Sequence, residues 1–210
     1  MDSPLLLEGS LFEAQPMKSD IPIEGGALSL WQPFLTPVDA NTFLALLSRT
    51  LDWKQDEVTI AGKKIPIPRL QAWYGDTKSQ YSYSGIPLSP LSWTPELLEI
   101  KQKIETVTQH RFNSVLANYY RDGNDSVAWH QDNEPELGEN PVIASLSLGD
   151  TRQFQLRHIT RKYPTIKLNL PHNALLLMSG ETQKNWYHQI PKTKKTVGSR
   201  INLTFRLIKS

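Results

Sequence analysis

Residues 114–132 have the sequence SVLANYYRDGNDSVAWHQD, which joins an apolar strand, a polar turn and a His-x-Asp pair. Side chains two positions apart on an extended backbone point to the same face. His130 and Asp132 can therefore offer an imidazole nitrogen and a carboxylate oxygen to one metal ion. A facial triad of two histidines and one carboxylate is typical of non-haem Fe(II) oxygenases, and it needs one more histidine. We predict that His188 completes the triad.

The chain has five histidines, of which the triad needs two. His110 closes a predicted helix, where an imidazole complements the helix dipole. His158 precedes a basic loop, and His172 follows Pro171 at a turn. His188 instead lies in an aromatic strand, twelve residues before the start of the last strand, a spacing that the family resemblance given below requires.

The last strand, residues 200–206, has the strictly alternating sequence RINLTFR. The alternation places Arg200, Asn202, Thr204 and Arg206 on one face and the apolar residues on the other. This polar face lies either in water or inside a barrel, where guanidinium forks bind a dicarboxylate through paired hydrogen bonds. The same period places Asn118 and Tyr120 on one strand face just before the metal pair. His-x-Asp alone is a weak signal, and the agreement among three strands strengthens it.

Together these residues resemble the AlkB-type Fe(II)/2-oxoglutarate-dependent nucleic-acid demethylases. The resemblance covers roughly residues 57 to 208. Its motifs are Asn118-x-Tyr120-x-x-Gly123, His130-x-Asp132, Trp186-Tyr187-His188 and Arg200-x-Asn202-x-Thr204-Phe205-Arg206. It implies oxidative demethylation of N-alkylated bases, such as 1-methyladenine and 3-methylcytosine, in DNA or RNA. The products are formaldehyde, succinate and CO2.

The resemblance also implies a role for each site residue. His130, Asp132 and His188 hold Fe(II), and 2-oxoglutarate and O2 take the open positions. Arg200 and Arg206 pair with the two carboxylates of 2-oxoglutarate, although the resemblance does not show which arginine takes which end. The cosubstrate contacts are completed by Asn118, Tyr120 and Asn202.

On the substrate side, the resemblance implies a nucleotide-recognition lid that includes residues 69–85. A target base must leave its stack to reach the metal, so aromatic and hydrogen-bonding groups should flank the site. Our candidates are Tyr81, Tyr83, Glu134, Arg69 and Arg157. Tyr83 stacks on the base and Glu134 faces its exocyclic amine under this hypothesis. Alternatively, the tyrosines are packing residues and Glu134 is a solvent-facing acid.

The predicted hairpin of residues 58–65 bears on the choice between single and double strands. Relatives specialised for duplex DNA place a bulky aromatic wedge at its tip, and the matching position here is Ala61. A methyl group cannot fill the gap that an extruded base leaves. We therefore expect a preference for single-stranded nucleic acid.

Length and composition predict one globular domain. The 210 residues are 39% hydrophobic, and no run approaches the roughly 20 apolar residues of a membrane span. We expect an irregular N-terminal arm over residues 1–30 and a single domain over residues 31–210, with the lid at about 57–92 and the core at about 111–208. The start of the chain lacks the pattern of a secretory signal, and the absence of cysteine excludes a disulfide framework. We expect a monomer in the cytoplasm, or in the nucleus of a eukaryotic cell, that does not bind membranes.

The expected elements indicate the fold class. Helical spacing predicts a helix over residues 38–51, capped by Thr36 or Asp39, and a second helix with Thr94 as its N-cap. Short strands follow at residues 142–148, 151–157, 165–170, 174–178, 185–189 and 200–207. We predict an α+β, mainly β fold: a double-stranded β-helix (jelly-roll, cupin-like) core with flanking N-terminal helices and a nucleotide-recognition lid.

Other function classes stay open. One is a 2-oxoglutarate oxygenase that acts on a protein or a small molecule. Others are a metal-binding jelly-roll without catalysis and a nucleic-acid binding module. The net charge of +2 does not decide among them. Basic clusters either supply phosphate contacts or are ordinary surface charges; examples are Lys63 with Lys64 and Lys194 with Lys195.

Overall fold

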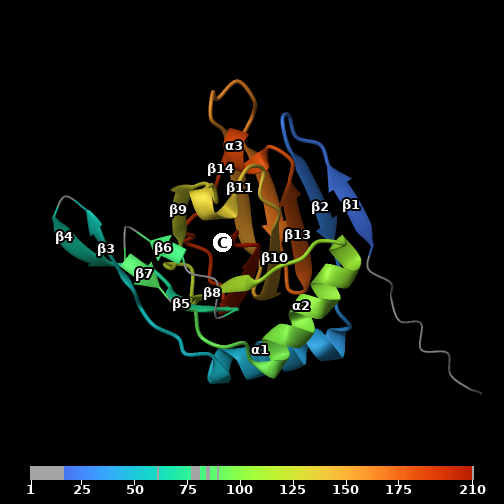
Figure 1. Ribbon diagram of the computed structural model, residues 1–210, viewed down its shortest axis with the longest axis vertical. Helices are drawn as coiled ribbons and strands as arrows, with labels where there is room; N and C mark the ends of the chain where they lie inside the picture. Colours follow the sequence, from blue (N-terminus) through green and yellow to red (C-terminus); the bar gives the residue numbers. More distant parts are fainter. Residues whose placement is uncertain (1–16, 61, 77–80, 84–85, 89, 210) are drawn as a thin grey trace, which may run out of the picture.

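Two antiparallel sheets form the body of the protein (Figure 1). The computed structural model describes residues 17–60, 62–76, 81–83, 86–88 and 90–209. The seven-stranded major sheet has the order β1 (Lys18–Ile21), β2 (Ala27–Trp31), β13 (Ala174–Ser179), β10 (Ile143–Gly149), β15 (Arg200–Arg206), β8 (Ser114–Tyr120) and β5 (Leu70–Gly75). The minor sheet has the order β12 (Ile166–Leu170), β11 (Arg152–His158), β14 (Trp186–Ile190) and β9 (Val127–His130). This architecture confirms the predicted double-stranded β-helix.

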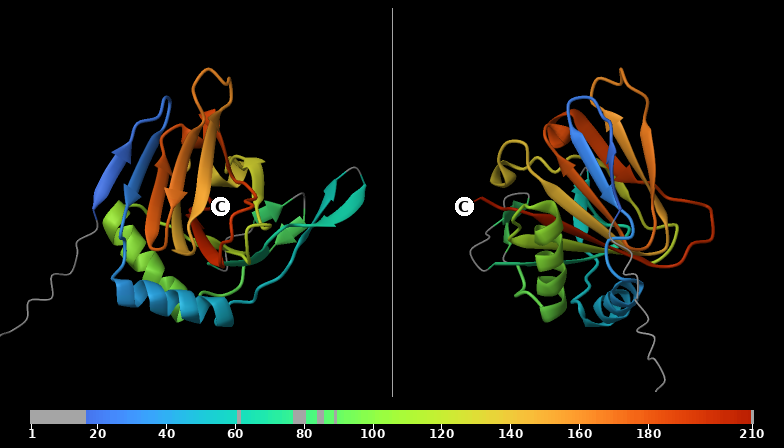
Figure 2. Two further views of the ribbon diagram at one scale, coloured as in Figure 1. Left: turned by 180° about the vertical axis from the view of Figure 1, so that it is seen from behind. Right: turned by 90° about the vertical axis from the view of Figure 1, so that its right-hand side faces the viewer.

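Helices α1 (Pro37–Thr50) and α2 (Pro95–Thr108) lie side by side against the major sheet (Figure 2). A buried cluster joins them to the alternate strand residues Ile201, Leu203 and Phe205. Thr36 caps α1 by accepting a hydrogen bond from the backbone N–H of Asp39, so Thr36 and not Asp39 is the cap. Thr94 caps α2 as predicted. The helices therefore cover the face of β15 that carries its apolar residues.

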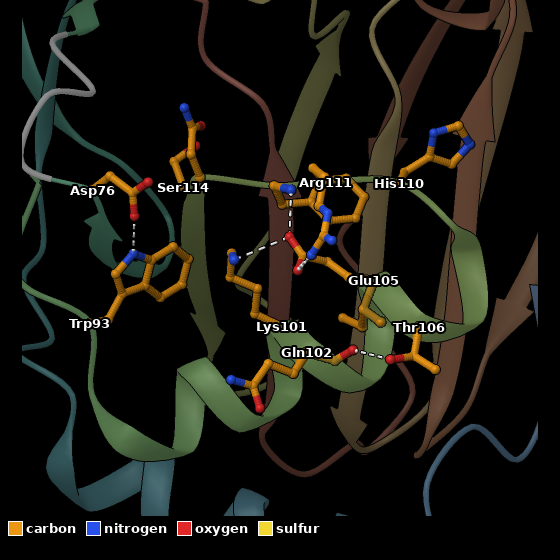
Figure 3. A network of polar contacts seen from close by, with 12 residues as sticks. Asp76, Trp93, Lys101, Gln102, Glu105, Thr106, His110, Arg111 and Ser114 are labelled. Carbon is orange, nitrogen blue, oxygen red and sulfur yellow. Dashed lines mark hydrogen bonds and ion pairs between the residues drawn. The ribbon is translucent and has the colours of Figure 1, made fainter.

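A buried carboxylate fixes the chain where α2 passes into β8 (Figure 3). Glu105 accepts a hydrogen bond from the backbone N–H of Phe112 (2.8 Å) and pairs with Lys101 (3.1 Å) and Arg111 (3.1 Å). Burial alone would raise the pKa of Glu105, but these three donors outweigh it and hold the pKa below its ordinary value. Phe112 in turn packs against Phe205 of β15. Glu105 thus anchors the start of β8.

The N-terminal prediction was wrong where the structure describes it. Residues 18–31 are not irregular: β1 and β2 form a hairpin, and β2 extends the major sheet by pairing with β13. Leu28 is buried between the two sheets, and Trp31 is buried on the helix side. β1 and β2 have only four and five residues, which is too short to show a clear period. The stability of the hairpin comes from the pairing of β2 with β13, about 145 positions away in sequence, and local patterns do not reveal such a partner. Residues 1–16 lie outside the described part of the chain.

Two small hairpins project beside β5 (Figure 1). The predicted hairpin is present as β3 (Glu57–Ile60) paired with β4 (Lys63–Pro66), and β6 (Tyr81–Tyr83) pairs with β7 (Ile86–Leu88). Ala61 lies outside the described residues. Two short helical turns, η1 (Pro135–Leu137) and α3 (Thr182–Asn185), were not predicted. In the part of the chain that the structure describes, no helix is long and apolar enough to cross a bilayer.

Candidate metal centre and adjoining cavity

Sheet register brings the three predicted metal ligands together. His130 at the end of β9 lies directly opposite His188 on β14, and their ring centroids are 4.2 Å apart. Asp132 follows β9 by two residues and turns toward the same point. Each residue offers a ligand atom, and these atoms all lie within 4.8 Å of one another. One imidazole from each of two strands and a nearby carboxylate form the facial arrangement that Fe(II) prefers in oxygenases.

The electrostatics of the three side chains suit a divalent cation. Burial alone would raise the pKa of Asp132, but Arg206, which donates to Asp132 Oδ1 at 2.8 Å, and the two histidines hold the pKa well below its ordinary range. Burial and the neighbouring His130 lower the pKa of His188 to about 3. At neutral pH the centre therefore presents one carboxylate and a neutral His188 imidazole, which is the protonation state that metal binding requires.

Neighbouring groups orient these ligands. His130 Nδ1 lies 2.8 Å from the carbonyl oxygen of Ala128, so it carries the proton and leaves the Nε2 lone pair for a metal. The backbone N–H of Asp132 donates to the side-chain oxygen of Gln183 (3.0 Å), which is fully buried on α3. The donor set and its support fit Fe(II).

A cavity of about 490 Å³, including its open mouth, adjoins the metal centre. The polar face of β15 lines this cavity. Of the two predicted alternatives for that face, exposure to water or a position inside the barrel, the structure shows the second. The lining also includes Asn118 and Tyr120 from β8, Arg69 from the segment before β5, Ser145 from the neighbouring strand β10, and Phe154 from β11 of the minor sheet. The structure thus brings every predicted cosubstrate residue into one cavity with the metal ligands.

Arg200 has an unusual environment within this cavity. Its side chain is 1% exposed, and its Nη2 donates to Ser147 Oγ at 2.9 Å. Its Nε and Nη1 are buried without a hydrogen-bond partner, and in the described part of the chain no carboxylate forms an ion pair with it. Burial lowers the pKa of Arg200 to about 10, so the guanidinium is charged at neutral pH. A ligand carboxylate fits here, because it would supply both the missing charge and the missing acceptors.

The amide side chains are held by hydrogen bonds. Asn202 donates to Ser145 Oγ (2.8 Å) and to the carbonyl oxygen of Leu146 (3.0 Å). Asn118 accepts a hydrogen bond from Arg69 Nε (2.8 Å), so Arg69 contacts the proposed cosubstrate residues. Sequence reasoning missed Ser145 and its neighbour Ser147. The signal for them was available, since both are alternate polar residues within the apolar strand β10.

The structure does not bring all predicted substrate residues into the cavity. Arg157 lies outside the cavity lining, on β11, with its guanidinium 4.3 Å from the centre of the Trp129 ring. Glu134 also lies outside the lining, at the start of η1, and its Oε2 is buried without a partner. Tyr81 and Tyr83 begin and end β6, but their side chains lie outside the described part of the protein.

Comparison with known proteins identifies the family of this fold and site. The model of the 2OG-Fe(II) oxygenase superfamily matches residues 27–206, a range that contains all three metal ligands and the arginine strand. The chain belongs to this superfamily. The solved structure of OsALKBH1 superposes on the chain with a TM-score of 0.61 and 16% sequence identity, covering 90% of this chain and 100% of that one. That likeness supports the double-stranded β-helix of the superfamily.

Relatives within the superfamily are of the AlkB type, which confirms the resemblance. Mouse alpha-ketoglutarate-dependent dioxygenase alkB homolog 3 is 42% identical over 191 residues, which cover 85% of this chain and 65% of the relative. Human DNA oxidative demethylase ALKBH2 is 42% identical over 158 residues, which cover 72% of this chain and 60% of the relative. The chain thus spans slightly less than two thirds of these curated relatives.

Proposed function

We propose that this superfamily member is an Fe(II)/2-oxoglutarate-dependent dioxygenase that demethylates N-alkylated bases in nucleic acid. The observation that carries the proposal is the presence, in one cavity, of the His130, Asp132 and His188 ligand set and of a buried Arg200 guanidinium with two unused donors. When bound, the iron, 2-oxoglutarate and O2 supply oxidative decarboxylation to succinate and CO2 together with hydroxylation of a C–H bond. A hydroxylated N-methyl group then leaves as formaldehyde.

We infer which arginine takes which end of the cosubstrate from a difference between the two arginines of β15. Arg206 donates to the metal ligand Asp132, so it lies beside the end of 2-oxoglutarate that approaches the metal. Arg200 lies six residues away on the same strand, roughly 20 Å along the backbone. Its free Nε and Nη1 therefore bind the distal carboxylate. Asn118, Tyr120 and Asn202 complete the cosubstrate contacts along the cavity.

A nucleic-acid substrate is supported by the similarity to a DNA oxidative demethylase and by an uneven distribution of charged residues along the chain. Residues 151–210 hold 12 of the 23 Lys and Arg residues but only one of the 21 Asp and Glu residues. Three of the four strands of the minor sheet, β11, β12 and β14, belong to this segment. A cationic segment that includes the strand of His188 suits a polyanion, and the overall charge of +2 conceals it.

We assign the substrate contacts in the same terms. Tyr83 stacks on the extruded base, Tyr81 also contacts the substrate, and Glu134 accepts a hydrogen bond from the exocyclic amine through its unpartnered Oε2. Arg69, which lines the cavity, and Arg157, which lies outside the lining beside Trp129, contact the strand. Ala61 gives a preference for single strands. We propose that the protein acts as a monomer. The reaction belongs where its nucleic acid is, in the cytoplasm or, in a eukaryotic cell, the nucleus.

The test is turnover of oligonucleotides that contain one 1-methyladenine or 3-methylcytosine, with Fe(II) and 2-oxoglutarate. Mass spectrometry should show loss of the methyl group, and one succinate should form for each base repaired. The matched control is Asp132→Ala, which removes the anionic metal ligand. Succinate formation without demethylation would assign the oxygenase a protein or small-molecule substrate instead. No succinate under any condition would indicate a jelly-roll without catalysis.

A further inference from the structure

Arg152 is a buried arginine that lies outside the cavity lining. It begins β11 of the minor sheet and is 2% exposed. Its guanidinium donates to the main-chain carbonyl oxygens of Asp122 (3.0 Å), Asp125 (2.8 Å) and Pro191 (2.7 Å). The two aspartates lie in the loop that follows β8 of the major sheet, and Pro191 follows β14. Arg152 therefore ties the two sheets together at one end of the double-stranded β-helix.

The ring of Tyr120 links Arg152 to the cavity. The guanidinium carbon of Arg152 lies 5.6 Å from the ring centre, and that of Arg200 lies 5.2 Å from it. Tyr120 and Arg200 are directly opposite each other in the register of β8 and β15. Cations within about 6 Å of an aromatic ring are attracted to it. One ring thus contacts two guanidiniums, one of which retains free donors for a ligand.

Arg152 is bound mainly through main-chain oxygens. The nearby buried carboxylate of Asp125 is engaged by Arg121, through Nε (2.7 Å) and Nη2 (2.8 Å). Burial lowers the pKa of Arg152, an effect that Tyr120 and the two aspartates oppose. A second buried cation beside Arg200 raises the positive potential at that end of the cavity, which favours an anionic group there.

We propose that Arg152 is a positioning residue that makes the cavity selective for a cosubstrate with a second, distal carboxylate. Arg152 fixes the plane of Tyr120, and Tyr120 fixes the plane of Arg200, so that Arg200 Nε and Nη1 stay available to the same ligand group. The proposal rests on the 2-oxoglutarate site of the proposed function. It concerns only the distal end, because the end near the metal depends on Arg206 and Asp132. A 2-oxo acid without a distal carboxylate therefore gains nothing from Arg152.

The test compares two ligands in the native protein and in Arg152→Met, both loaded with Mn(II). Calorimetry measures the Kd of 2-oxoglutarate and of 2-oxopentanoate, which keeps the 2-oxo acid end but ends in a methyl group. Residues that orient metal ligands typically change metal affinity or activity by about 10-fold or more when they are replaced, and we take the same magnitude for a residue that orients Arg200. We expect that loss for 2-oxoglutarate in Arg152→Met and less than about a twofold change for 2-oxopentanoate. Equal weakening of both ligands, or of neither, would overturn the proposal.

Arg121→Met is the matched control, because it removes a guanidinium from the same loop that bonds the Asp125 carboxylate and none of the three carbonyl oxygens that accept from Arg152. Its Kd for 2-oxoglutarate should equal that of the native protein. If this variant weakens 2-oxoglutarate as much as Arg152→Met does, the order of the loop and not Arg152 sets the affinity, and the proposal is wrong.

Arg152→Lys covers the case in which Arg152→Met does not fold. It keeps the charge but cannot present a flat guanidinium to Tyr120 or bond three carbonyls in one plane. We expect selective weakening of 2-oxoglutarate here too, and native affinity for both ligands would contradict the proposal. These measurements use no nucleic acid. Lack of demethylation would therefore count against the proposed function alone, whereas native protein that does not bind 2-oxoglutarate would refute both.

Discussion

Replacing Arg200 with methionine should separate ligand binding from stability. In the ligand-free protein, Arg200 is a buried cation with two unsatisfied donors, and such a charge costs several kcal/mol of desolvation. Its hydrogen bond to Ser147 and its cation–π contact with Tyr120 together stabilise the folded protein by roughly 2–4 kcal/mol. The two contributions nearly cancel. We expect the free energy of unfolding of ligand-free Arg200→Met to stay within about 1 kcal/mol of the native value.

The affinity for 2-oxoglutarate, unlike the stability, should fall strongly in Arg200→Met. A carboxylate that accepts from both Nε and Nη1 forms two charge-assisted hydrogen bonds, each worth roughly 1.5–3 kcal/mol. Losing both should weaken 2-oxoglutarate by about 3 kcal/mol or more, which is at least about 100-fold in Kd. Calorimetry on the Mn(II)-loaded protein gives the Kd, and urea unfolding gives the stability. Arg161→Met, a change at an exposed arginine, is the control. A large loss of stability with unchanged 2-oxoglutarate affinity would show that Arg200 is a structural residue.

Four further predictions concern single side chains. Asp132→Ala should abolish turnover and weaken metal binding, because two imidazoles remain without an anionic ligand, and retained demethylation would exclude the triad. Tyr83→Ala should cost oligonucleotide turnover about 1–3 kcal/mol, the value of one base stack, while substrate-free oxidation of 2-oxoglutarate continues; loss of both reactions would make Tyr83 a core residue. Native protein should repair single strands faster than duplexes, with a partial gain on duplexes for Ala61→Phe, and turnover of matched oligonucleotides at one salt concentration decides this. Glu105→Gln should lower stability by about 1–3 kcal/mol at neutral pH. The pKa of Glu105 in the folded protein lies below its ordinary value of 4.5, so the stability difference between native protein and Glu105→Gln should be complete above pH 4.5. It should shrink as the pH falls through the pKa of the folded state. A stability difference that does not depend on pH would rule out the ion pairs as its source.

Local patterns in the sequence predicted most of the fold and the metal ligands for a physical reason. The period of two on β15 survives in the structure because one face packs under the helices and the other lines the cavity. The pairing of His130 with His188 followed from a motif, but its geometry depends on the register of β9 with β14, which no local pattern specifies. The β1–β2 hairpin was missed for the same reason. Non-local pairing stabilises it, and its own residues carry little signal.

Alternation also could not distinguish the arginines that face the interior. Arg152, Arg200 and Arg206 all occupy inward positions on their strands, yet each has a different electrostatic partner. Arg206 pairs with a metal ligand, Arg152 bonds three carbonyl oxygens, and Arg200 keeps two donors without an acceptor. A guanidinium whose donors are used within the protein is held in place by those bonds, whereas one with buried, unused donors is suited to bind a ligand. This difference supports the proposal that the distal end of the cavity binds a carboxylate, because Arg200, alone among these three, has buried donors without a hydrogen-bond partner.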